Sequence, residues 1–103
     1  MLTDPYPIYG YIYDVNNNPI DNASIIVYGP DGSKTTNTSS GGYYSINVQS
    51  IANENDYVTV VAASGDKCGS SSEMINPSNL STNINLIVGN ELPIATLNFG
   101  IEI

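Results

Sequence analysis

Short apolar runs with a period of two, each followed by turn-forming residues, recur along this chain. Ile8 and Ile12 alternate with tyrosines, and residues 57–63 are an almost unbroken run of β-branched and small apolar residues. Such alternation places successive side chains on opposite faces of a strand. Gly, Pro, Asn and Asp separate the runs at close to the spacing that is typical of a sandwich or barrel. No segment keeps apolar residues at helical spacing for three turns, so the pattern predicts an all-β protein.

The chain is 103 residues long, which allows one domain with one core. The runs expected as strands are residues 5–15, 23–28, 34–38, 43–48, 57–63, 68–75, 82–88 and 93–103. The run 68–75 is the weakest of these because serines and glycines dominate it. We therefore expect residues 1–103 to form a single antiparallel Greek-key β-sandwich of about seven strands.

Alternation also predicts which residues share the inner face of the sandwich. The expected inner residues are Ile8, Ile12, Ile25, Val27, Ile46 and Val48. We expect Ile25 and Val27 to be cross-strand neighbours of the first strand, and Tyr44 to join this face from the run 43–48. Gly10 on the first strand is expected to make room for a large residue opposite. Tyr9, Tyr11 and Tyr13 fall on the opposite face, and we expect Tyr28 beside them on the adjacent strand. This tyrosine set is a candidate surface for carbohydrate or a protein partner. Packing against a neighbouring domain is the favoured interpretation of the same surface.

The charge balance is strongly acidic. Ten carboxylates face two lysines, Lys34 and Lys67, for a formal net charge of −8. Phosphate contacts come largely from Lys and Arg, so we expect no nucleic-acid partner. Attraction to anionic lipid is equally unfavourable. No apolar run approaches the roughly 18–20 residues of a membrane span, and we expect no membrane insertion.

The residue inventory also limits catalysis. The chain contains no histidine, which rules out Ser-His-Asp and Cys-His mechanisms. Cys68 is the only cysteine, so the chain can build neither an internal disulfide nor a structural zinc site by itself. Two carboxylates such as Glu54 and Glu73 suggest glycoside hydrolysis only weakly, because such enzymes use a larger cleft. We expect a protein that is not an enzyme.

One loop resembles the first half of a calcium-binding loop. Asp14, Asn16 and Asn18 place oxygen ligands at alternate positions, and calcium is the only cofactor that the sequence suggests. The pattern then fails, because Pro19 replaces the usual Gly and Ile25 stands at the position of the bidentate carboxylate. An Asx-rich turn is the favoured alternative.

Three Asn-X-Ser/Thr sequons are present, at Asn22, Asn37 and Asn79. A chain rich in Asn and Ser produces such matches by chance. They predict glycosylation only if a eukaryote or archaeon exports the protein.

Several segments resemble carboxypeptidase regulatory-like domains, which have a transthyretin-like (prealbumin-like) sandwich fold. The similar segments are residues 8–14, 18–20, 22–27, 35–37, 41–46 and 57–63. Residues 97–100, Leu-Asn-Phe-Gly, are similar to the closing strand of collagen-adhesin B-type repeats of surface proteins. Those repeats often carry an isopeptide bond from a lysine on the first strand. The first strand here has no lysine, so we expect no such bond.

The resemblance implies a non-catalytic structural or stalk module of a secreted or cell-surface protein. Its partners would be neighbouring domains of the parent chain. Two alternatives remain open at this point: a carbohydrate- or protein-binding module that uses the tyrosines, and an accessory domain of a secreted peptidase or glycosidase. The motifs behind the resemblance are structural, so they support the fold more than any activity.

Overall fold

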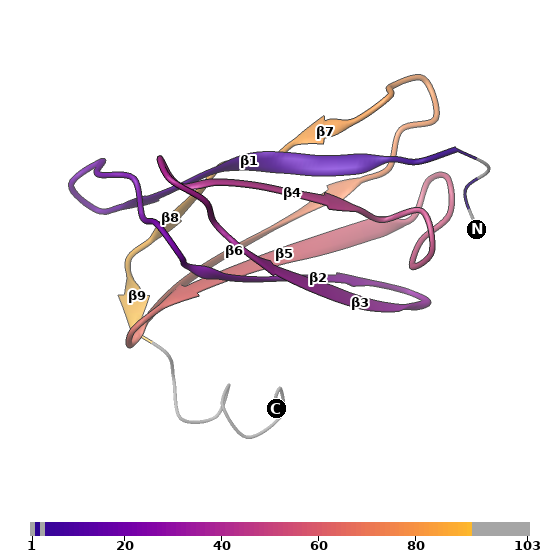
Figure 1. The fold of residues 1–103 in the computed structure, drawn as a ribbon. Coiled ribbons are helices and arrows are strands. Elements are labelled where there is room, and N and C mark those ends of the chain that lie inside the picture. The colour runs from indigo at the N-terminus through magenta and orange to yellow at the C-terminus, as the bar shows by residue number, and fades with distance from the viewer. Residues whose placement is uncertain (1, 3, 92–103) are drawn as a thin grey trace.

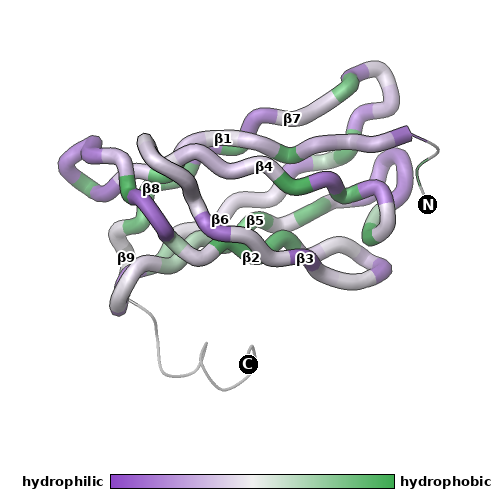
Figure 2. Tube along the Cα trace, viewed as in Figure 1, coloured by the Kyte–Doolittle hydropathy of each residue, from purple (hydrophilic) through white to green (hydrophobic). Residues whose placement is uncertain are grey.

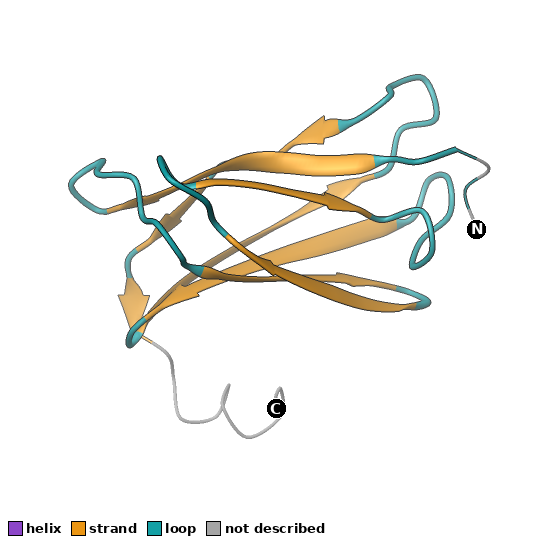
Figure 3. Cartoon of the chain, viewed as in Figure 1, coloured by secondary structure: helices purple, strands orange, loops and turns teal. Residues whose placement is uncertain are grey.

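The described part of the chain consists of strands and loops. The computed structural model describes residues 2 and 4–91, and no helix occurs among them (Figure 3). The strands are β1 (Pro7–Asp14), β2 (Ser24–Gly29), β3 (Gly32–Asn37), β4 (Tyr43–Asn47), β5 (Tyr57–Ser64), β6 (Lys67–Met74), β7 (Thr82–Asn83), β8 (Leu86–Val88) and β9 (Asn90–Glu91). The predicted all-β fold is confirmed. The predicted strand at residues 93–103 lies outside the described residues.

Two sheets pack face to face as a sandwich (Figure 1). The smaller sheet has β1 between β4 on one side and β7 and β8 on the other. The larger sheet has the order β3-β2-β5-β6-β9, and all its neighbours are antiparallel. Two-residue turns at residues 30–31 and 65–66 close its β2–β3 and β5–β6 hairpins. Gly65 has a φ of 62°, which suits the primed turns that such tight hairpins favour.

One pairing differs from the wholly antiparallel arrangement expected from the sequence. β1 runs parallel to β7 and β8, with Ile8 aligned to Thr82 and Ile12 to Leu86. The register is the same in both places, so β7 and β8 are one strand interrupted at residues 84–85. Parallel pairing needs a long connection, and here most of the chain lies between the partners. With β7 and β8 taken together and the two-residue β9 set aside, the described residues form seven strands.

The interruption is built around Gly10. The carbonyl oxygen of Ile84 lies so close to Gly10 that a Cβ there would overlap it. Tyr44, the β4 neighbour of Gly10, crosses β1 at this point and donates its hydroxyl to the same carbonyl at 2.7 Å. The backbone amide of Tyr11 is satisfied by the Oδ1 atom of Asn85 at 2.9 Å. Because Gly10 has no side chain, hydrogen bonds can connect the three adjacent strands β4, β1 and β7–β8 at this point.

The inner faces of the two sheets meet in one apolar core. The six predicted inner residues are all buried. Figure 2 shows hydrophobic and hydrophilic residues alternating around the end of β4. Complete burial of an Ile or Val side chain stabilises the fold by about 1.5–3 kcal/mol. Ile25 and Val27 were expected beside β1 in the same sheet, which is wrong: β2 pairs with β3 and β5, so these side chains face β1 from across the sandwich.

Close approaches join the two sheets at their edges. At one edge, the Nζ atom of Lys34 on β3 donates to the backbone carbonyl of Asn47 on β4 at 2.9 Å. At the other, the carbonyl oxygen of Ile87 on β8 lies where a Cβ of Gly69 on β6 would be. A side chain at Gly69 would push β8 away from the larger sheet. Gly69, one of the residues that made β6 look weak, therefore allows the sandwich to close.

Candidate functional site

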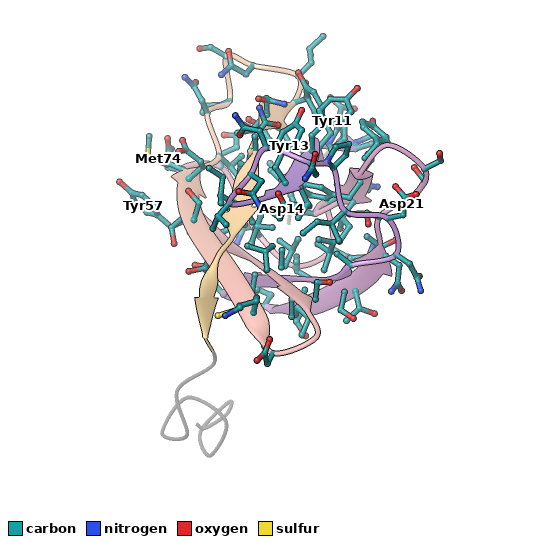
Figure 4. All side chains as sticks on the ribbon, turned by 90° about the vertical axis from the view of Figure 1, so that its left-hand side faces the viewer. Tyr11, Tyr13, Asp14, Asp21, Tyr57 and Met74 are labelled. Carbon is teal, nitrogen blue, oxygen red and sulfur yellow. The ribbon has the colours of Figure 1, made fainter. Side chains whose placement is uncertain are left out.

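The outer face of the smaller sheet carries the β1 tyrosines. Tyr11 is 41% exposed, while Tyr9 and Tyr13 are half-buried. Figure 4 shows Tyr11 and Tyr13 next to each other on β1, and their ring centroids are 6.4 Å apart. The ring of Tyr43, the β4 partner of Tyr11, meets it edge-on with 5.4 Å between centroids. The prediction that these tyrosines are at least partly exposed is confirmed.

We call this surface the tyrosine face, and it consists of Tyr9, Tyr11, Tyr13, Tyr43 and Ile87. Ile87 on β8 is the cross-strand partner of Tyr13 and is 56% exposed. Exposed polar side chains border it, namely Ser45, Asn83 and Asn85. Asn83 donates its Nδ2 to the Tyr9 carbonyl at 3.4 Å, which places that amide against the strand. The face is thus an aromatic and aliphatic surface with a polar border.

No charged side chain alternates with the inner residues on this face. Outward positions of the described β1, β4, β7 and β8 hold Tyr, Ser, Asn, Pro and Ile. The whole chain, in contrast, has a net charge of −8. Among the described residues, the hydroxyls of Tyr9, Tyr11, Tyr13 and Tyr43 have no hydrogen-bond partner. The face therefore presents uncharged polar atoms that are available to a ligand.

The expected position of Tyr28 beside these tyrosines is wrong. Tyr28 lies on β2 in the larger sheet, where its cross-strand partners are Ser33 and Thr59. It is exposed on the opposite side of the sandwich. Tyr57 and Met74 are cross-strand partners on that sheet and are also exposed (Figure 4). Chain neighbours were assumed to be sheet neighbours, whereas β1 and β2 belong to different sheets.

Tyr43 and Ile87 were missed as members of the candidate site. A signal for Tyr43 was present, because it precedes Tyr44, which had been placed on the inner face, and so had to point outward. The sequence did not show that β4 pairs with β1, which places Tyr43 beside Tyr11. Ile87 likewise alternates with buried residues of β8, and only the parallel register brings it to Tyr13.

The Asp14 loop has the geometry of an Asx turn. The Oδ1 atom of Asp14 accepts hydrogen bonds from the backbone amides of Asn16 at 2.8 Å and Asn18 at 3.0 Å. The Asn18 amide bond is the main cause that lowers the pKa of Asp14. Asn17 occupies the left-handed region with a φ of 65°. The turn that the sequence analysis favoured is the arrangement found, and calcium binding stays a prediction.

A shallow depression of about 400 Å³ lies near this loop at one end of the sandwich. It is lined by Asp14, Pro19, Ile20, Asp21, Ser64, Lys67 and Val88. Asp21 is exposed and accepts a hydrogen bond from the backbone amide of Gly41 at 2.8 Å. Both carboxylates therefore hold loops in place. Within residues 2 and 4–91, no group of three or more His, Cys, Asp or Glu is arranged to hold a metal ion.

The remaining predicted positions lie on the surface. Asn22, Asn37 and Asn79 are all exposed, and Asn22 adopts a positive φ of 58° in a turn. Glycosylation at these residues stays a prediction. Cys68 is a half-buried free thiol beside Ala63. None of the described segments is a helix long and apolar enough to cross a membrane.

The architecture defines a β-sandwich of the immunoglobulin-like or prealbumin-like type. No protein-family model matches the sequence, and no curated protein sequence matches it significantly. Similarity is found among solved structures at low identity. The 3-chlorocatechol 1,2-dioxygenase of Rhodococcus opacus 1CP superposes with a TM-score of 0.61 at 9% identity, over 84% of this chain and 60% of that one.

Two similar structures are pilins. BcpA, the major pilin subunit of Bacillus cereus, has a TM-score of 0.61 at 11% identity, over 85% of this chain and 30% of its own. The shaft pilin SpaA of Lactobacillus rhamnosus GG, as a D295N mutant, has a TM-score of 0.52 at 10% identity, over 86% and 49%. This chain therefore spans less than two thirds of each of these proteins. The similarity shows the fold.

Proposed function

We propose that this chain is a non-catalytic structural module of a secreted or cell-surface protein. In this proposal it is a transthyretin-like, carboxypeptidase regulatory-like domain that connects and spaces neighbouring domains of its parent chain. The observation that carries the proposal is the parallel pairing of β1 with β7 and β8.

Because β1 is parallel to β7 and β8, all three run from the same end of the sandwich toward the other. β1 begins and β8 ends at opposite ends of the sandwich, as Figure 1 shows. The chain thus enters β1 at one end of the described sandwich and leaves β8 at the other. This geometry suits an extended array of domains, in which each module adds length.

The same pairing determines how the module responds to tension. Pulling along the chain loads the hydrogen bonds between β1 and the β7–β8 strand in shear, so they bear the force together. An antiparallel hairpin pulled open at its ends breaks its bonds one at a time. The Tyr44–Ile84 bond and the Asn85–Tyr11 bond add side-chain links across the same strands. The arrangement is suited to a domain under load.

The similarity to known structures supports a role at the cell surface. Two of the similar proteins are pilin subunits, one described as a major pilin and the other as a shaft pilin. The catechol dioxygenase that shares the fold is an enzyme, so the fold by itself does not select between structural and catalytic roles.

Single-molecule force spectroscopy tests the proposal. The domain is placed between reference domains and pulled through its two chain ends. The comparison uses Cys68→Ser with Tyr57→Cys and Met74→Cys, which apply the force across the open end of the β5–β6 hairpin. We expect a clearly higher unfolding force through the chain ends, because shear loads many bonds at once and forced unfolding follows the unfolding rate.

Two variants show whether the proposed strands carry the load. Tyr44→Phe should lower the force measured through the chain ends, because it removes the bond to Ile84. Tyr57→Phe changes an exposed side chain far from these strands and should leave the force unchanged. Equal forces in the two pulling directions would refute the structural role proposed here.

A further inference from the structure

The tyrosine face is an unusual surface for so acidic a chain. It is uncharged, its tyrosine hydroxyls have no partners among the described residues, and it is centred on β1, the middle strand of the smaller sheet. We infer that the tyrosine face binds a neutral carbohydrate chain. This inference is independent of the proposed structural role, because a spacer needs no ligand.

The chemistry of the face matches that of a sugar ring. A pyranose has C–H-rich faces that stack on aromatic rings and hydroxyls around its edge that form hydrogen bonds. Tyr11 and Tyr43 expose ring surface, and tyrosine combines an apolar ring with a polar tip. The Oδ1 atom of Asn85 is held by the Tyr11 amide, and its Nδ2 atom has no partner among the described residues. Ring surface and one amide donor without a partner among the described residues therefore lie close together.

Size argues for a small ligand over a stable protein partner. Tyr11 is 41%, Tyr43 38% and Ile87 56% exposed. With about 150–250 Å² for a large side chain, these three residues expose on the order of 300 Å², and the half-buried Tyr9 and Tyr13 add less than that. A stable protein interface needs roughly 800 Å² from each partner. The face is large enough for a few sugar units and too small for such an interface.

The net charge of the chain favours neutral over acidic carbohydrates as ligands. The chain carries a net charge of −8 and has two lysines, so an acidic polysaccharide is repelled at long range. No charged side chain alternates onto the described tyrosine face to offset this repulsion. Neutral glycans meet no such barrier. The ligand class is therefore an uncharged glycan.

Affinity electrophoresis in native gels tests this directly. The probes are four soluble neutral polysaccharides, namely hydroxyethylcellulose, laminarin, galactomannan and dextran, and carboxymethylcellulose is the charged counterpart of the first. We expect at least one neutral polysaccharide to retard the protein, and carboxymethylcellulose to have no such effect. Failure of all four neutral polysaccharides to retard it would overturn the inference, as would stronger retardation by the polyanion.

Matched variants locate the binding. We expect Tyr11→Ala and Tyr43→Ala each to raise the dissociation constant for the retarding polysaccharide at least tenfold. Tyr11→Phe keeps the ring and should retain most of the affinity. Tyr28→Ala is the control, because it removes an exposed tyrosine from the other sheet. Melting temperatures establish that each variant is folded. If Tyr11→Ala leaves retardation unchanged, or instead abolishes a dimer seen by analytical ultracentrifugation, a glycan is not the occupant.

Discussion

The hydroxyl of Tyr44 offers the sharpest test of the structure. The side chain is 1% exposed and donates to the Ile84 carbonyl at 2.7 Å, across β1 at Gly10. Tyr44→Phe removes this bond and leaves a buried carbonyl without that donor. An unmatched buried polar group costs about 1–3 kcal/mol, so we expect a loss of about that size at pH 7. For a domain of this length, each kcal/mol lowers the melting temperature by about 4–8 °C.

The same residue predicts a pH dependence with a definite sign. Burial raises the pKa of Tyr44 above the ordinary tyrosine value of about 10. Below that ordinary value both states are protonated, and the contribution of Tyr44 to stability is complete. As the pH rises further, the unfolded chain loses this proton and the folded protein keeps it. The wild type should then lose about 1.4 kcal/mol per pH unit through this group, and Tyr44→Phe should not.

Urea unfolding followed by circular dichroism at pH 7, 10 and 11 measures both effects. The difference between wild type and Tyr44→Phe should be largest at pH 7 and should shrink above pH 10. The other tyrosines are common to both proteins, so their titration largely cancels. Tyr57→Phe, at a 63% exposed position, should change little at any pH. A difference that is absent at pH 7, or constant up to pH 11, would refute the buried hydrogen bond.

Four further outcomes are expected. Tyr11→Ser should cost within about 1 kcal/mol and the buried Ile12→Ala about 2–5 kcal/mol in denaturant unfolding, and the reverse order would contradict the register. Backbone amides lower the pKa of Asp14, so its contribution to stability is complete above the unfolded pKa and is lost as the pH falls through the folded one. The melting-temperature difference between wild type and Asp14→Asn should therefore shrink below about pH 4, and a constant difference would contradict this. Low micromolar calcium should hardly change the melting temperature, and a large rise would reveal a site at Asp14. Intact mass should equal the sequence mass, whereas a deficit of one ammonia or one water would indicate an isopeptide bond.

Strand identity and strand faces were determined locally, and the sequence predicted them well. The run 43–48 illustrates this, because its alternation places Tyr44 and Ile46 inward and both are buried. A side chain's face depends only on its position along its own strand, with a period of two. The outward direction of Tyr11 followed from the same rule, and so did its exposure.

Strand partners were decided by the tertiary structure. Tyr28 points outward as its alternation requires, yet it lies on the other side of the sandwich from Tyr11 because β2 pairs with β5. The break between β7 and β8 likewise depends on contact of Ile84 with Gly10, residues far apart in the chain. The sequence showed a glycine in a strand and predicted a close neighbour, but it did not identify that neighbour.

The physical reason is the range of the interactions. Alternation, turn chemistry and composition act within a few residues, so the all-β class, the inner faces and the Asp14 turn could be read from the sequence. Pairing depends on contacts between segments many residues apart, whose relative energies emerge only when both sheets pack at once. The tyrosine face depends on both local alternation and long-range pairing. Local alternation turns Tyr11 outward, and the long-range pairing of β1 with β4 and β8 brings Tyr43 and Ile87 to it.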